Sequence, residues 1–188
     1  MTATDRARWD DRYAGRVGGA PALPEVFAQQ VDAIPVAGPA LELACGSGSA
    51  AVWLAERGMT VWGVDVSAVA IEQARELASR HGVADRCRFS VVDLDDGLPP
   101  GPPAAMILCH RFRDPRLYPA IAGRLAAGGL LAICVLSEVG ARPGQFRATA
   151  GELGEAFADL QPISAGEGEG QAWLLARAKG EPQWPSPQ

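Results

Sequence analysis

Two predicted strands of this chain each end in residues that can bind a nucleoside. Residues 40–44 form an apolar strand that runs into a glycine-rich turn, residues 44–48. A helical stretch follows, and the next predicted strand, residues 60–65, ends at Asp65. A strand, a glycine turn, a helix and a second strand with a terminal carboxylate bind a nucleoside at the carboxyl ends of parallel strands. We therefore expect Asp65 to accept hydrogen bonds from the ribose hydroxyls, and Ser67 to cap the following helix.

The glycine turn alone does not decide which nucleoside is bound. Gly46-x-Gly48-x-x-Ala51, with an acid about 20 residues further on, also matches the fingerprint of dinucleotide-binding folds. Glu42 lies inside the first strand, beneath the expected turn, and favours S-adenosylmethionine over NAD. Its carboxylate would repel a pyrophosphate but attract a sulfonium and an ammonium group. The other interpretation of Glu42 is a strand residue paired to a backbone amide or an arginine.

These features belong to a longer series of short motifs. They include Trp-Asp-Asp-Arg-Tyr at residues 9–13 and Gly-Val-Asp-Val-Ser at residues 63–67. The chain resembles class I S-adenosylmethionine-dependent methyltransferases, in particular the small tellurite-resistance-like group. The resemblance rests on the order and spacing of motifs over nearly the whole chain, at residues 9–13, 41–48, 51–58, 63–67, 92–94, 109–112, 125–130 and 151–153.

The resemblance implies contacts to the adenine ring of S-adenosylmethionine. Asp93 would accept a hydrogen bond from the adenine amino group, the Leu94 amide would reach a ring nitrogen, and Val66 would lie against the ring. Two alternatives stay open. The acidic stretch that starts at Asp93 also fits a solvated turn, and Val66 also fits an ordinary core position.

The resemblance also implies a helix that closes over the cofactor. Trp9, Arg12 and Tyr13 share one face of a short predicted helix by their spacing, which is equally compatible with a helix that is simply packed on the core. The full set of expected cofactor-binding residues is Trp9, Arg12, Tyr13, Glu42, Ala44, Cys45, Gly46, Ser47, Gly48, Asp65, Val66, Asp93, Leu94 and Cys109.

The expected catalytic residues are His110 and Arg111, which leave the fourth predicted strand. Methyl transfer from a sulfonium dissipates charge, so positioning and water exclusion supply most of the catalysis. A base is needed only when the acceptor holds its proton strongly, and His110, with an ordinary pKa near neutrality, is available for that role. The alternative is a hydrogen-bonded wall residue. Arg111 and Arg113 either orient an anionic acceptor or pair with surface acids near Asp114.

Three functions remain open from the sequence. The leading one is an enzyme that methylates a small molecule at O, N, S or another heteroatom. The second is a binding module that keeps the S-adenosylmethionine pocket without turnover, because Ser49 and Ala50 stand where the resembling group usually has Arg-Asn. The third is a nicotinamide-dependent oxidoreductase.

Composition limits these functions further. The 188 residues, 48% of them apolar, suit one domain, and a net charge of -5 without a long basic run argues against nucleic acid. The four cysteines stand singly and only two histidines are present, so we expect reduced thiols, a cytoplasmic location and no metal site. No apolar run reaches the roughly 18 residues that span a membrane. The oligomeric state is not predicted.

The elements that must position these residues alternate between strand and helix. Expected helices cover residues 6–13, 24–34, 49–57, 67–81, 115–126 and 152–158; expected strands cover residues 40–44, 60–65, 88–92, 104–109, 130–136, 160–164 and 171–178. The glycine-rich join at residues 166–170 is too short for a crossover helix, so the last two strands must be antiparallel.

We therefore expect an α/β fold, a single doubly wound and mostly parallel seven-stranded sheet with a C-terminal antiparallel hairpin. The resemblance implies the strand order 3-2-1-4-5-7-6. Residues 1–35 would form an N-terminal helical cap over the cofactor, residues 36–179 the S-adenosylmethionine-binding domain, and residues 180–188, with three prolines, a flexible tail.

Overall fold

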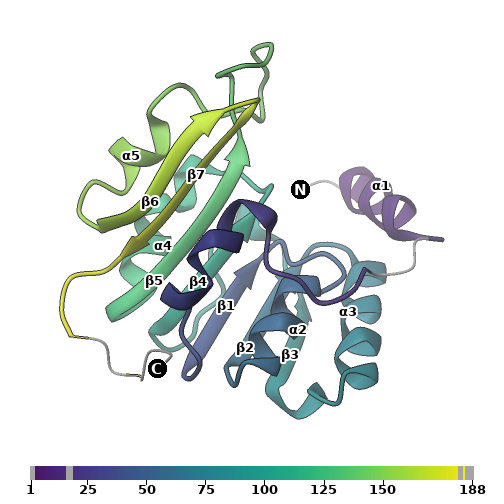
Figure 1. Ribbon diagram of the computed structural model, residues 1–188. Helices are drawn as coiled ribbons and strands as arrows, with labels where there is room; N and C mark the ends of the chain where they lie inside the picture. The colour runs from purple at the N-terminus through teal and green to yellow at the C-terminus, as the bar shows by residue number, and fades with distance from the viewer. Residues whose placement is uncertain (1–2, 16–18, 182–183, 185–188) are drawn as a thin grey trace.

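Seven strands form one sheet in the order β3-β2-β1-β4-β5-β7-β6, which confirms the predicted fold class (Figure 1). The structure is a computed structural model that describes residues 3–15, 19–181 and 184. The strands are β1 (Pro39–Leu43), β2 (Thr60–Asp65), β3 (Cys87–Val91), β4 (Ala104–His110), β5 (Leu125–Leu136), β6 (Gln161–Gly168) and β7 (Gln171–Arg177). Strands β1 to β5 pair in parallel, whereas β7 runs antiparallel to both β5 and β6.

Helices cover both faces of the sheet (Figure 1). The first face carries the 3₁₀ segment η1 (Glu25–Ala33) and the helices α2 (Ser49–Glu56) and α3 (Ala68–Arg80), whose apolar residues share one core cluster. The second face carries α4 (Tyr118–Arg124) and α5 (Glu152–Ala156), with a core cluster of their own. The strands between them are buried on both sides, as their near-continuous apolar sequences predict.

Helix α1 (Ala3–Tyr13) lies apart from these layers, above the carboxyl ends of β1 and β2, where it faces α3 (Figure 1). Three short 3₁₀ segments complete the set: η2 (Ala84–Arg86), η3 (Leu94–Asp96) and η4 (Pro115–Leu117). No described helix combines the length and the apolar character that crossing a membrane requires.

Two predicted elements differ in kind from those observed. Residues 24–34 form a 3₁₀ segment that is kinked at Gln30, with Pro24 just before its first turn. The predicted helix of residues 115–126 is only η4 followed by α4, because Leu125 already pairs with Ala104 in the sheet. Gly128 and Gly129, which follow the predicted helix, lie inside an irregular stretch of β5 between the Leu125 and Leu130 pairings.

The C-terminal hairpin is tighter than predicted. Strand β6 continues through the glycine-rich join as far as Gly168, and only Glu169 and Gly170 make the turn. Both turn residues have positive φ, +51° and +78°, as the two-residue turns that fit a twisted hairpin require. Of the predicted tail, residues 180–188, the structure describes residues 180, 181 and 184, and Trp184 packs against the core beside Gly38.

Candidate active site

The glycine turn between β1 and α2 is held in a conformation that few residues tolerate. Ala44, Gly46 and Gly48 have φ values of +51°, +53° and +79°. A Cβ atom on Gly48 would stand 2.7 Å from the Cβ of Ala74, and one on Gly46 would stand 2.7 Å from the Tyr13 hydroxyl. Both glycines are therefore required by backbone conformation and by close neighbours. The amides of Cys45 and Gly48 donate to the carbonyl oxygens of Val64 and Cys45, which fixes the turn ahead of α2.

Asp65 joins the end of β2 to this turn. Its Oδ2 accepts a hydrogen bond from the Gly46 amide and its Oδ1 accepts one from the Ser67 amide, both at 2.9 Å. The residue is only 6% exposed, and burial raises the pKa of its carboxyl group, an effect that the amide bonds partly offset. An ionised carboxylate has about four lone-pair sites, so acceptor capacity remains for ribose hydroxyls. Ser67 caps α3 through the Ala70 amide, which confirms its predicted role.

Glu42 is a buried acid beneath the glycine turn. It is 5% exposed, and its Oε2 has no hydrogen-bond partner. Burial raises the pKa of Glu42 to about 8, although the Ala51 amide acts in the opposite direction. No described cation pairs with it, so the alternative of an arginine partner is wrong, while the backbone-amide alternative holds for one side of the carboxyl group. An unpartnered buried carboxyl group at this place fits a cationic ligand.

Helix α1 is fixed above the turn by polar contacts. Asp10 Oδ1 accepts hydrogen bonds from the Ser67 hydroxyl at 2.6 Å and from the Val69 amide at 3.2 Å. Gln73 donates from its side-chain amide to the carbonyl oxygen of Tyr13 at 2.9 Å. The Tyr13 hydroxyl thereby comes to lie over Gly46. Sequence reasoning missed Asp10 and Gln73, because nothing local shows that a helix near residue 10 will meet one near residue 70.

The two other residues predicted on the α1 face, Trp9 and Arg12, contact each other. The Arg12 guanidinium lies 5.1 Å from the centroid of the Trp9 ring, and the ring centroids of Trp9 and Tyr13 are 6.4 Å apart. The three side chains therefore form one surface on the helix that covers the glycine turn. Their contact with a cofactor stays a prediction.

Asp93 and Leu94 lie just beyond β3, which ends at Val91, one residue before the predicted end of this strand. Asp93 caps η3 by accepting a hydrogen bond from the Asp95 amide, and it pairs with Arg6 of α1 at 2.9 Å. Leu94 and Val66 are both buried, at 3% and 9% exposure. The Arg6–Asp93 ion pair is a second link between α1 and the sheet that the sequence did not indicate.

At the end of β4, the side chains of Cys109 and His110 lie on opposite faces of the sheet. The Cys109 side chain lies in the core cluster of the second face and donates to the Phe112 carbonyl at 3.3 Å, and burial raises the pKa of its thiol to about 12. A ligand at the glycine turn can therefore meet Cys109 only through its backbone. His110 alternates to the first face, where burial and then the Arg111 charge lower its pKa to about 4. The near-neutral pKa assumed for a base at His110 is not what the structure shows.

Arg113 forms an ion pair with an acidic residue. Its guanidinium donates to both carboxylate oxygens of Glu152, at 2.7 Å and 2.6 Å, and the Tyr118 hydroxyl donates to the same carboxylate at 2.8 Å. Of the two arginines considered for an anionic acceptor, Arg113 is thus an internal ion-pair partner. Arg111 remains exposed at a φ of +61°, which is unusual for a residue with a side chain.

Metal chemistry finds no support in the part of the chain that the structure describes, where no group of three or more His, Cys, Asp or Glu side chains is suitably placed. The four cysteines are free thiols.

The comparison with protein families decides between the nucleoside-binding folds. Residues 40–129, which contain the glycine turn, Asp65, Asp93 and His110, match the family described as methyltransferase domain. Over this part of its length the chain is similar to methyltransferase domains. The match bears out the predicted resemblance to methyltransferases and gives the nicotinamide alternative no support.

Solved structures share the fold of this chain. TehB from Haemophilus influenzae has a TM-score of 0.75 and 18% identity, over 91% of this chain and 67% of that one. DhpI in complex with SAH has a TM-score of 0.64 and 22% identity, over 95% of each chain. Geranyl diphosphate C-methyltransferase from Streptomyces coelicolor A3(2) has a TM-score of 0.68 and 15% identity, over 95% of this chain and 98% of that one.

Two curated relatives match parts of this chain. A protein of Synechococcus sp. is 34% identical over 134 residues, which are 68% of this chain and 31% of the relative. Ribosomal RNA small subunit methyltransferase C of Alcanivorax borkumensis is 43% identical over 49 residues, which are 26% of this chain and 15% of the relative. The chain thus spans less than a third of the length of these relatives.

Proposed function

We propose that this chain transfers the methyl group of S-adenosylmethionine to a heteroatom of a small-molecule acceptor. The observation that carries the proposal is Glu42, a buried carboxyl group with an unpartnered oxygen beneath the glycine turn. A ligand with two cationic groups supplies what this acid lacks, whereas a pyrophosphate would be repelled. The methyltransferase domain family and the strand order support the same assignment.

The chain's residues would hold the cofactor in three groups. Glu42 and the backbone of residues 44–48 would bind the methionine part, with Trp9, Arg12 and Tyr13 of α1 above it. Asp65 would accept the ribose hydroxyls. Val66, Asp93 and Leu94 would enclose the adenine ring, and the backbone of Cys109 would close the side nearest β4. When bound, S-adenosylmethionine supplies an electrophilic methyl group on a sulfonium.

His110 and Arg111 would face the acceptor. With a pKa lowered to about 4, His110 is neutral at physiological pH and is a weak proton acceptor. The site therefore suits an acceptor that is already ionised, or one that loses its proton readily, so that the residues position it and exclude water. The net charge of -5 favours a small molecule over nucleic acid, although one curated relative is named for ribosomal RNA.

A binding module without turnover is the second candidate, and Ser49 is the observation behind it. The Ser49 hydroxyl donates to the Ala20 carbonyl at 2.7 Å and accepts from the Ala22 amide at 3.1 Å. A side chain at this position thus fixes the segment that precedes η1 and does not face a ligand. The resembling group usually has an arginine here, whereas the Ser49 hydroxyl is used by residues 20–22 and offers no polar group to a ligand.

An acceptor screen with labelled S-adenosylmethionine separates the two candidates. The protein is incubated with pools of small hydroxy, amino, thiol and carboxylic compounds, and transfer of label is followed by chromatography. Transfer to at least one pool supports the enzyme. No transfer to any pool, from protein that binds S-adenosylhomocysteine, would favour the binding module.

A further inference from the structure

A row of side chains crosses the first face of the sheet next to the proposed cofactor site. His110 of β4 pairs with Cys134 of β5, and Cys134 pairs with Trp173 of β7. Side chains directly opposite one another in a sheet share a face, and neighbouring strands lie about 4.8 Å apart. Leu136, two residues beyond Cys134, shares this face and is 37% exposed. We call His110, Cys134, Leu136 and Trp173 the platform.

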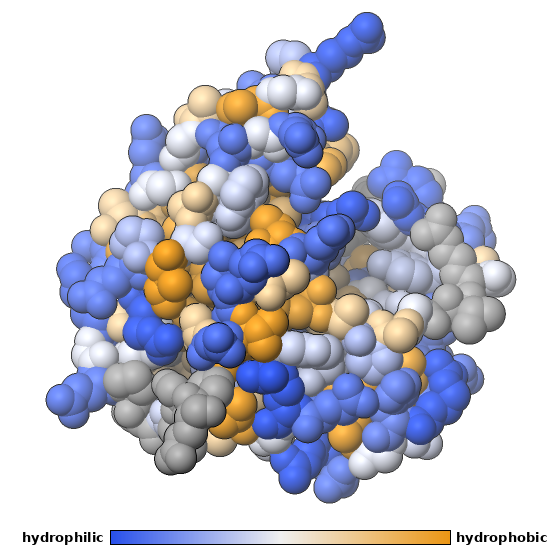
Figure 2. Space-filling model, in the orientation of Figure 1, coloured by the Kyte–Doolittle hydropathy of each residue, from blue (hydrophilic) through white to orange (hydrophobic). Residues whose placement is uncertain are grey.

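The platform marks the boundary between covered and open sheet. One step toward the amino end of β4, the row of Leu108, Ala132 and Leu175 is fully buried. Figure 2 shows a hollow on this face of the molecule, between α1 and the end of the sheet formed by β5, β7 and β6. Of the platform residues, Cys134 is still buried, whereas His110 and Trp173 are partly exposed and Leu136 is exposed, so these three border open space.

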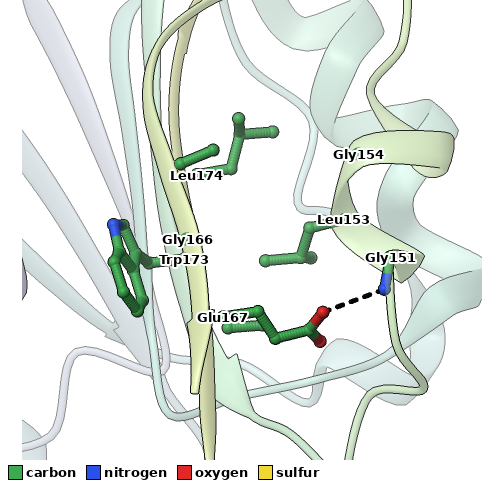
Figure 3. Close-up of a pocket in the computed structure, with 9 residues that line it drawn as sticks. Gly151, Leu153, Gly154, Gly166, Glu167, Trp173 and Leu174 are labelled. Atoms are coloured by element: carbon green, nitrogen blue, oxygen red, sulfur yellow. Dashed lines mark hydrogen bonds between the residues drawn. The ribbon is translucent and has the colours of Figure 1, made fainter. Parts of the chain in front are cut away.

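Trp173 presents a flat surface to this space. Its six-membered ring lies directly on Gly166 of β6, at a position where a Cβ atom would overlap it. Figure 3 shows the indole on the opposite side of the strands from Leu153 and Glu167, which line a pocket beneath α5 together with Gly166 and Trp173. The indole nitrogen has no hydrogen-bond partner among the described residues. It is not one of the buried polar atoms without a partner, so it is not buried. One ring face is thus supported by Gly166, and the N–H is open to solvent.

Arg111 brings a positive charge to the same face. Its amide donates to the Cys134 carbonyl at 2.8 Å, which continues the β4–β5 pairing with Arg111 in a left-handed conformation. Arg111 directly follows His110 of the platform, and its charge adds to burial, the larger cause, in lowering the pKa of His110. Among the described residues Arg111 has no ion pair, whereas Arg113 binds Glu152 and Arg116 binds Asp114.

A flat aromatic surface and an unpaired cation recognise complementary chemistry. An aromatic ring stacks on an indole, and a carboxylate forms a two-point pair with a guanidinium. The platform itself holds no acid, and the proposed cofactor adds further cationic groups beside it, so an anion is favoured on charge as well. We propose that the methyl acceptor is a small aromatic carboxylate, with its carboxylate at Arg111 and its ring against Trp173 and Leu136. This inference rests on the proposed function.

Binding of matched probes to the protein saturated with S-adenosylhomocysteine tests the inference by calorimetry. The probes are benzoate, 4-hydroxybenzoate and 2-naphthoate, their carboxamides, and cyclohexanecarboxylate. We expect at least one aromatic acid to bind tenfold or more tightly than its amide, and at least threefold more tightly than the saturated acid. Equal affinity for acid and amide, or no binding of any probe at millimolar concentration, would overturn the inference.

Substitutions at Arg111 and Trp173 test which residue causes the preference for an acid and which causes the preference for an aromatic ring. Arg111→Asn, which tolerates the left-handed backbone, should abolish the preference for acid over amide. Trp173→Leu should abolish the preference for an aromatic ring, and Trp173→Phe should restore part of it. Arg88→Asn is the matched control, because Arg88 stacks on Trp62 near the opposite end of the strands. Preferences that survive Arg111→Asn and Trp173→Leu in folded protein contradict the assignment.

Binding of S-adenosylhomocysteine itself is measured first. If it fails, the proposed function is wrong. If it succeeds and the probes show no preference, only the acceptor class is wrong.

Discussion

Glu42 is the residue whose environment departs furthest from its ordinary chemistry. Burial raises its pKa to about 8, so the carboxyl group is largely protonated at neutral pH when no cation is present. The sequence predicted the position of this acid beneath the glycine turn, because a strand residue four places before Gly46 must lie there. It did not predict the unpartnered oxygen, which depends on side chains from α2 and β4 that close around it.

The raised pKa makes stability depend on pH. A carboxyl group with a raised folded-state pKa favours the fold below its unfolded pKa, and this contribution is lost as pH rises through the folded value. Glu42 should therefore lower the free energy of unfolding between about pH 4.5 and pH 8. We predict that Glu42→Gln reduces the difference in unfolding free energy between pH 5 and pH 8 by about 2–4 kcal/mol. Urea titrations at pH 5 and pH 8 measure the free energy of unfolding. The same difference between the two pH values in the variant and the unmodified protein would refute the prediction.

Asp65 combines a structural and a ligand-binding role. Its two amide hydrogen bonds hold the glycine turn to β2, so Asp65→Ala would disturb both. Asp65→Asn keeps an oxygen acceptor but removes the charge. We predict that Asp65→Asn weakens binding of S-adenosylhomocysteine by about 1–3 kcal/mol, as expected when hydroxyl donors lose a charged acceptor. Calorimetry measures the loss of binding free energy. If the folded variant has an unchanged dissociation constant, Asp65 has only a structural role.

His110 is expected to act on the acceptor and not on the cofactor. We predict that His110→Ala changes the affinity for S-adenosylhomocysteine by less than about threefold, or roughly 0.7 kcal/mol. Turnover of an identified acceptor should fall, mainly through a higher KM, since a base with a pKa of about 4 contributes little proton transfer at neutral pH. A hundredfold fall in kcat with a rate inflection near pH 6.5 would show instead that His110 is a general base with an ordinary pKa.

At the scale of elements, α1 is the helix on which the site depends most. Its contacts with the rest of the molecule include Asp10 on the start of α3, Gln73 on the Tyr13 carbonyl and Arg6 on Asp93. The pairing partners are 57 to 87 positions apart in the chain. The amphipathic pattern of residues 6–13 was enough to predict the helix, and the resemblance its place, but such distant polar pairs leave no local signal.

Loosening α1 should weaken ligand binding more than it weakens the fold. We predict that Asp10→Asn raises the dissociation constant for S-adenosylhomocysteine about 3- to 10-fold, equivalent to the loss of about one hydrogen bond to a charged group. The melting temperature should change little, because the strands and the core clusters are untouched. Asp11→Asn is the matched control, since Asp11 is exposed on the same helix. Equal effects of the two substitutions would exclude a specific role for the Asp10 contacts.

The elements also show where sequence reasoning succeeds and where it fails. The strands were predictable because their apolar runs and the turns between them are local signals. The start of β5 was missed, because Gly128-Gly129 after a helical stretch signals a helix end, while the structure uses both glycines within an irregular strand pairing. The length of β6 was also missed, because glycine is a weak strand former and three of them stand at residues 166–170.

In the molecule as a whole, the two faces of the sheet carry different features. On the first face, α2, α3 and α1 surround the glycine turn, and the platform continues toward β7. On the second face, α4 and α5 complete the core, and the Arg113–Glu152 ion pair fixes α5 to the end of β4. The family and the strand order were predictable from sequence, whereas the acceptor side was not, because its side chains come from three strands and no motif records their juxtaposition.

The central claim is that the site binds the methyl donor and not a dinucleotide, and calorimetric titration of the unmodified protein tests it most directly. S-adenosylhomocysteine and NAD are titrated under identical conditions, with melting temperatures measured in parallel. We predict that S-adenosylhomocysteine binds with a dissociation constant in the micromolar range, about -8 kcal/mol, and raises the melting temperature, while NAD does neither. Binding of NAD without binding of S-adenosylhomocysteine would contradict the account.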